Sequence, residues 1–163
     1  MREKLEIDEY QGYFADCYVL TNQRTESFVE EFLNHFVPDR REGADEYEVS
    51  QYANNPVEVF ETAKEAVKFL VENKSVKHSL YWSNPTKSDL RGAELFFTDD
   101  SHIIVGIYCE TKYPNTEIED KIFKEIKEFC GSDEGYITYE DTPPHNSQEF
   151  REIMKKMKAQ QGI

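Results

Sequence analysis

The stretch that most restricts the fold of this chain covers residues 93–110. Two runs rich in strand-forming residues flank a short polar turn, Asp99-Asp100-Ser101, and this pattern predicts a β-hairpin. The second run, residues 103–109, is the longest apolar run in the sequence. A strand that is apolar at both alternating sets of positions is usually covered on both faces, so we expect this strand in the middle of a sheet.

Strands and helices are mixed along the rest of the chain. Residues 13–21, 46–51, 78–83 and 135–140 have the composition of strands. Apolar residues recur at helical spacing in four other segments. Since the hairpin requires antiparallel pairing, we predict an α+β fold with one mixed or antiparallel sheet of five or six strands. About three amphipathic helices should cover one face, followed by a C-terminal helix.

Capping residues set the expected helix boundaries. Thr25 is expected to cap the first helix and Ser147 the last. Thr116 and Glu119 have the spacing of a capping box for the third helix, which Gly131 should end.

The second helix is expected to begin at Asn55-Pro56-Val57-Glu58, which combines a capping residue, a proline at the first helical position and an acid. Its apolar stripe would consist of Val59, Phe60, Ala63, Val67 and Leu70. In domain terms, residues 1–11 are predicted to be a flexible segment, 12–145 the α+β domain, and 146–163 a helix and tail.

The charge balance restricts the partners. The chain has 33 acidic and 19 basic residues, which gives a net charge of −14. Such a surface repels nucleic acid phosphates and anionic membranes, so we expect neither as a partner. If charge selects a partner, that partner is cationic, and a basic protein is the leading expectation. Solubility alone is the competing explanation of the acidity.

Cysteine usage indicates a reducing compartment. Cys17, Cys109 and Cys130 are odd in number and lie in apolar runs, which predicts buried reduced thiols rather than disulfides or nucleophiles. The N-terminal residues contain no apolar leader, and no run approaches the roughly 20 apolar residues of a membrane helix. These features predict a cytoplasmic protein.

No local catalytic motif is present. The sequence contains no dinucleotide fingerprint, P-loop, zinc-protease helix, nucleophile elbow or EF-hand loop, which is a modest argument against an enzyme. No cofactor is expected. A metal-dependent enzyme or metal-binding protein is nevertheless an alternative, because two carboxylate-rich segments each contain a histidine. The residues concerned are Asp99, Asp100 and His102 in the hairpin turn, and Glu140, Asp141 and His145 after the last strand.

Acidic residues interleaved with tyrosines are the remaining candidate surface. The first group is Asp45, Glu46, Tyr47, Glu48 and Tyr52, and the second is Glu140 and Asp141. Carboxylates steer a basic protein to the surface, and tyrosines supply contact area. An ordinary solvated edge strand would also carry such charges. A third alternative is a small-ligand-binding sensory domain with a pocket lined by Phe and Tyr.

In size, acidity, single-domain α+β layout and lack of a catalytic motif, the chain resembles the bacterial immunity proteins that neutralise a co-produced toxin. The resemblance implies tight binding to a basic toxin without a cofactor. The basic C-terminal helix, with Arg151, Lys155, Lys156 and Lys158, could lie on its own acidic chain or on a second copy, so a homodimer is compatible with each interpretation.

Overall fold

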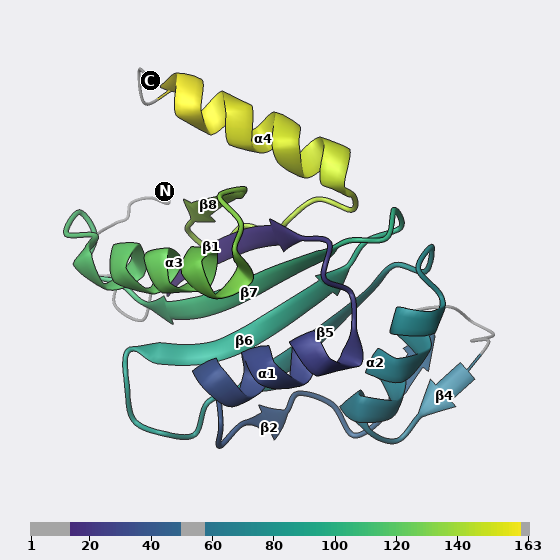
Figure 1. The fold of residues 1–163 in the computed structure, drawn as a ribbon. Coiled ribbons are helices and arrows are strands. Elements are labelled where there is room, and N and C mark those ends of the chain that lie inside the picture. The colour runs from purple at the N-terminus through teal and green to yellow at the C-terminus, as the bar shows by residue number, and fades with distance from the viewer. Residues whose placement is uncertain (1–13, 50–57, 161–163) are drawn as a thin grey trace, which may run out of the picture.

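A computed structural model describes residues 14–49 and 58–160. The predicted α+β class is confirmed: a six-stranded antiparallel sheet, a small two-stranded sheet and four helices make up the described part of the chain (Figure 1). The strand order in the large sheet is β2-β5-β6-β7-β1-β8. These strands are β1 (Phe14–Thr21), β2 (Arg41–Glu42), β5 (His78–Ser83), β6 (Leu90–Phe97), β7 (Ile103–Glu110) and β8 (Gly135–Thr138). Strands β3 (Tyr47–Val49) and β4 (Glu58–Phe60) form the small sheet.

The predicted hairpin is strands β6 and β7, and it lies at the centre of the sheet. Its register runs from Phe97 opposite Ile103 to Leu90 opposite Cys109. Strand β7 is flanked by β6 and β1, and its first five residues are all buried. The prediction of a central strand covered on both faces is therefore confirmed for that half of β7.

Helices α1 (Glu26–Phe36), α2 (Ala63–Glu72) and α3 (Glu117–Cys130) pack on one face of the sheet, here called the inner face. The Phe32 and Phe36 rings of α1 contact Phe129 of α3, with ring centroids 5.9 and 5.7 Å apart. Thr25 caps α1 as predicted, because its side chain accepts a hydrogen bond from the Phe28 amide. Trp82 also faces this core and is 2% exposed.

The predicted start of the second helix is wrong. Residues Glu58–Phe60 form strand β4, and α2 begins at Ala63 behind an N-cap at Thr62. Val59 is consequently 48% exposed rather than part of the helical stripe. Pairing with β3 outweighs the local helix signal in this segment, and residues 50–57 lie outside the described part.

The start of α3 also differs from prediction. Thr116 makes no capping bond to the backbone; its hydroxyl instead donates to Asp120 Oδ2 at 2.7 Å. Glu119, the expected acid of the capping box, is fully buried and accepts hydrogen bonds from Thr111 and Tyr139. The helix ends as predicted at Gly131, which has a φ of 61°.

Helix α4 (Ser147–Gln160) lies on the opposite side of the sheet from α1 and α2 (Figure 1). Phe150 and the apolar residues of α4 near it cover Leu20, Ile104 and Tyr136 at one end of this outer face. Arg151 pairs with Glu134 at 2.7 Å, so the basic helix packs on its own chain.

The start of α4 is tied to the hairpin turn. Asp100 Oδ2 accepts hydrogen bonds from the Ser147 amide at 2.9 Å and from its hydroxyl at 2.6 Å. The acid of the turn therefore satisfies a backbone N–H at the helix start, a function that we predicted for Ser147 itself.

Arg24 joins the C-terminal end of α2 to the hairpin. It is 1% exposed, and its guanidinium donates to five backbone carbonyl oxygens. These belong to Leu70, Asn73, Val76, Thr98 and His102. Burial lowers the pKa of this guanidinium to about 10, which leaves it charged at neutral pH. Hydrogen bonds from a charged donor are stronger than those from a neutral one, so a guanidinium can bind several carbonyl oxygens that converge on one buried position.

Candidate functional site

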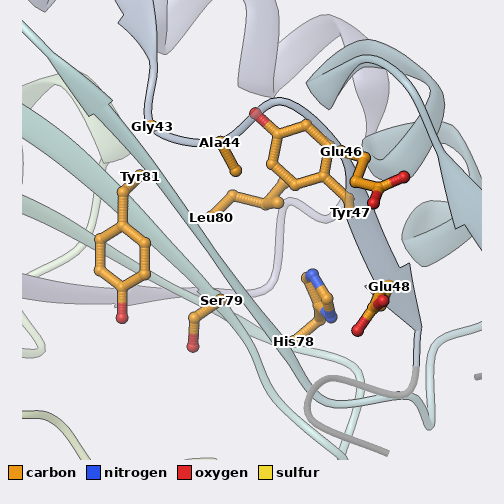
Figure 2. Close-up of a pocket in the computed structure, with 9 residues that line it drawn as sticks. All are labelled: Gly43, Ala44, Glu46, Tyr47, Glu48, His78, Ser79, Leu80 and Tyr81. Carbon is orange, nitrogen blue, oxygen red and sulfur yellow. The ribbon is translucent and has the colours of Figure 1, made fainter.

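The first predicted acidic group borders a cavity of about 320 Å³ at the β5 edge of the sheet, here called the edge cavity (Figure 2). Residues 43–44 and 46–48 supply one wall and residues 78–81 of β5 the other. Figure 2 shows Leu80 pointing towards Tyr47, whereas Ser79 and Tyr81 point to the other side of the strand. Asp45, which does not line the cavity, is exposed, as are Glu46 and Glu48, which do.

Tyr47 lines the edge cavity but is largely buried. It is 6% exposed, and its hydroxyl donates to Glu42 Oε1 at 2.9 Å. Strand β3 turns Tyr47 and Val49 into the core, and the same alternation turns Glu46 and Glu48 to the outside. Tyr52 lies outside the described residues.

His78 is the polar residue of the edge cavity that the sequence did not indicate as a binding residue. It is 2% exposed, and within residues 14–49 and 58–160 its buried Nδ1 atom has no hydrogen-bond partner. Burial lowers the pKa of His78 to about 4, so the ring is neutral at physiological pH. It can therefore exchange one hydrogen bond with a ligand but supplies no charge there.

The second predicted acidic group, Glu140 and Asp141, borders a different cavity of about 290 Å³ on the outer face, here called the sheet pocket. Its lining comes from four strands and the segment after β8: Phe14, Asp16, Tyr18, Tyr81, Glu94, Phe96, Tyr108, Glu140, Asp141 and Thr142. No residue of α4 is among them. The two cavities share Tyr81, which is 43% exposed.

Two glycines let aromatic rings lie across the sheet in this pocket. A Cβ atom at Gly92 would come within 2.3 Å of the Tyr108 ring, and one at Gly106 within 2.9 Å of the Tyr18 ring. Any larger residue would displace the ring above it. The close approach of the Tyr18 ring therefore requires a glycine at position 106.

Hydrogen bonds and ring contacts fix the walls. The Tyr18 hydroxyl donates to the Asp141 carbonyl at 2.7 Å, which holds the segment after β8 against the pocket. The Phe96 ring makes edge-to-face contacts with Tyr18 and with Tyr81, each at a centroid distance of 5.9 Å. The aromatic lining is therefore formed before any ligand binds.

The pocket also contains two acids that the sequence analysis missed. Asp16 is 6% exposed, and its Oδ2 accepts a hydrogen bond from the Glu140 amide at 2.9 Å. Burial is the main cause that raises the pKa of Asp16, to about 6. Glu94 Oε2 is buried and has no hydrogen-bond partner within the described residues. Burial, and then the charge of Asp16, raise the pKa of Glu94 to about 8.

One feature of the sequence could have indicated these two acids: each is a charged residue inside an otherwise apolar strand. Asp16 stands between Ala15 and Cys17, and Glu94 between Ala93 and Leu95. Their proximity depends on β1 pairing with β7 next to β6, which the sequence pattern does not specify.

The fold brings the metal candidates near one another but gives them other partners. The Asp99 amide donates to the His145 carbonyl at 3.4 Å, so the two segments do meet. Asp100 binds Ser147 as described, and the His145 ring lies 2.7 Å from Lys77 Nζ. In the part of the chain that the structure describes, no group of three or more His, Cys, Asp or Glu residues could hold a metal ion.

The cysteines are buried and free, as predicted. Burial raises the pKa of the Cys130 thiol to about 12. Contact with Cys109, and then burial, raise the pKa of Cys17 well above its ordinary value. A thiolate nucleophile is disfavoured at both positions.

Comparison with known proteins yields no relative: no protein-family model, curated protein or solved structure matches the chain. Over residues 14–49 and 58–160, no helix combines the length and apolar character that crossing a membrane requires.

Proposed function

We propose that this chain is a non-enzymatic binding protein that takes up a basic partner protein on the surface around Tyr81. The observation that carries the proposal is that this residue, 43% exposed, lines two cavities, each bordered by carboxylates. Glu46 and Glu48 line the edge cavity, and Glu140 and Asp141 line the sheet pocket. A net charge of −14 adds long-range attraction for a cationic surface.

The arrangement suits a protein better than a small solute as the partner. The carboxylates belong to separate segments on either side of Tyr81, so one occupant that contacts them all must be broad. Exposed acids increase the association rate, and a central aromatic ring supplies contact area. Inhibition of a basic toxin, as by an immunity protein, is the role that we propose for this surface. Three free cysteines favour a reducing compartment such as the cytoplasm.

A metal-dependent function has less support. Asp100 and His145, two of its six candidates, contact Ser147 and Lys77. The carboxylate of Asp100 has the structural task of holding the start of α4 to the hairpin turn.

The test begins with capture of the partner from host lysate at low salt, followed by association kinetics with the purified partner. The double variant Glu46→Lys/Glu48→Lys should reduce the association rate about tenfold or more at about 50 mM salt. The effect should shrink at about 500 mM salt, where charges are screened within a few ångströms.

A matched control makes the same change in charge on the helix side of the molecule. Glu72 and Glu128 are exposed residues of α2 and α3. The variant Glu72→Lys/Glu128→Lys should change the rate less than the test variant does. Equal rates for the two variants would remove the surface around Tyr81 from the interface.

A further inference from the structure

The sheet pocket contains acidic but no basic side chains, which favours a positively charged ligand. Asp16 of β1 and Glu94 of β6 line the pocket from the two strands that flank β7, and no Lys or Arg is among the lining residues. Glu94 Oε2 is buried and receives no hydrogen bond within the described part of the chain. A buried carboxyl oxygen without a donor is costly, and a ligand that donates to it removes that cost.

The walls favour the same kind of ligand. Tyr18, Tyr81, Phe96 and Tyr108 surround the two acids. Aromatic faces attract cations, and the attraction is largest where water is excluded. A volume of about 290 Å³ is at the lower limit of small-molecule pockets, so it suits one side-chain head group better than a large ligand.

We infer that the sheet pocket binds one organic cation, the ammonium or guanidinium head group of a Lys or Arg side chain that the partner inserts between the tyrosines. The source of this side chain rests on the proposed function, whereas the cation site itself does not. Asp16 and Glu94 would supply the negative charge, and the rings would enclose the alkyl stem. Glu140 and Asp141 at the border would guide the cation inward.

Binding should release a proton. With a pKa of about 8, Glu94 is mostly protonated at pH 7 in the free protein, and a bound cation favours its charged form. The titratable groups that share the pocket with Glu94 are Asp16, Tyr18, Tyr81, Tyr108, Glu140 and Asp141. Burial raises the pKa of Tyr18 and of Tyr108, so both stay neutral, and Asp16 with a pKa of about 6 is mostly ionised before the cation arrives.

Model side chains test the site without the partner protein. N-acetyl-lysine methylamide and N-acetyl-arginine methylamide are titrated into the full chain, with N-acetyl-norleucine methylamide as the neutral control. Calorimetry and NMR shifts of residues 16, 18, 94 and 108 follow binding. We expect at least about tenfold tighter binding of the charged ligands. Calorimetry in phosphate and in Tris buffer at pH 7 should show release of nearly one proton.

Conservative variants assign the effect to the two acids. Glu94→Gln and Asp16→Asn keep the shape of each side chain, and each should weaken binding about tenfold or more. Glu94→Gln should also abolish most of the proton release. Glu72→Gln, an exposed acid of α2 on the helix side of the molecule, is the control and should bind like the wild type.

Several results would overturn the inference. These are equal binding of the norleucine and lysine ligands, no saturable shift with either cation, unchanged binding by Glu94→Gln, or occupation by Mg²⁺ or Ca²⁺ in preference to the organic cations. In each case a partner that still depends on Glu46 and Glu48 would leave the proposed function in place, so the two proposals fail separately.

Discussion

Two carboxyl groups in the sheet pocket hold their protons at pH values where exposed carboxyl groups have lost them. The pKa of Glu94 is raised from 4.5 to about 8, chiefly by burial, and that of Asp16 from 3.8 to about 6. In the unfolded chain both acids return to their ordinary values. At pH values between the unfolded and the folded pKa of each acid, the folded protein binds more protons than the unfolded chain. Its free energy of unfolding must therefore fall as pH rises through this range.

This difference gives a prediction for Glu94. Between pH 6 and pH 9 the wild type should lose about 3 kcal/mol of unfolding free energy relative to Glu94→Gln, since each pKa unit corresponds to about 1.4 kcal/mol. Urea unfolding, followed by the fluorescence of the buried Trp82, measures both proteins across this range. Glu48→Gln should follow the wild type. Parallel pH profiles of wild type and Glu94→Gln would contradict the buried state of this carboxyl group.

Single residues were predicted well where burial alone decided the outcome. The three cysteines were expected in the core and are there. Tyr47 was predicted as a contact residue, although its own alternation with Glu46 and Glu48 already placed it on the apolar side of β3. Asp16 and Glu94 could not be paired from the sequence, because their proximity is a property of the strand order.

At the level of elements, local signals gave most helices and strands but not the start of α2. Asn55-Pro56 is a strong helix start in isolation, yet the segment after it pairs with β3. Strand pairing of this kind joins residues that are distant in sequence, and no local pattern reports it. The same holds for Glu119, whose partners Thr111 and Tyr139 lie outside its helix.

Arg24 connects α2 to the β6–β7 hairpin, and no sequence motif indicated this role. We expect Arg24→Met to lower the free energy of unfolding by about 3 kcal/mol or more, because five backbone carbonyl oxygens lose a hydrogen bond from the guanidinium. The matched control is Arg91→Met on β6, whose side chain is 39% exposed and which should change stability by about 0.5 kcal/mol or less. Urea unfolding measures both, and equal stabilities would show that Arg24 does not hold α2 to the hairpin.

At the scale of the whole molecule, the excess of acidic residues lowers the stability of the folded state. A net charge of −14 creates self-repulsion in the compact state, and salt screens it. Raising NaCl from about 20 mM to about 500 mM should therefore increase the thermal unfolding midpoint by several degrees. A variant with Asp45→Asn, Glu46→Gln and Glu48→Gln should show a smaller increase when scanned by differential calorimetry. An unfolding midpoint that does not change with salt would contradict this view of the surface.

The position of β1 in the sheet has a consequence for how the protein is made. This strand pairs with β7 on one side and with β8 on the other. The partner that is synthesised later, β8, ends at Thr138. A ribosome adds roughly 5–20 residues per second, and about ten seconds therefore separate the synthesis of β1 from that of its second neighbour. Until its first neighbour, β7, has been made, a nascent strand with buried-type residues such as Val19 and Leu20 has no sheet to join. Chaperones that shield nascent chains would have their clearest target in residues 14–21.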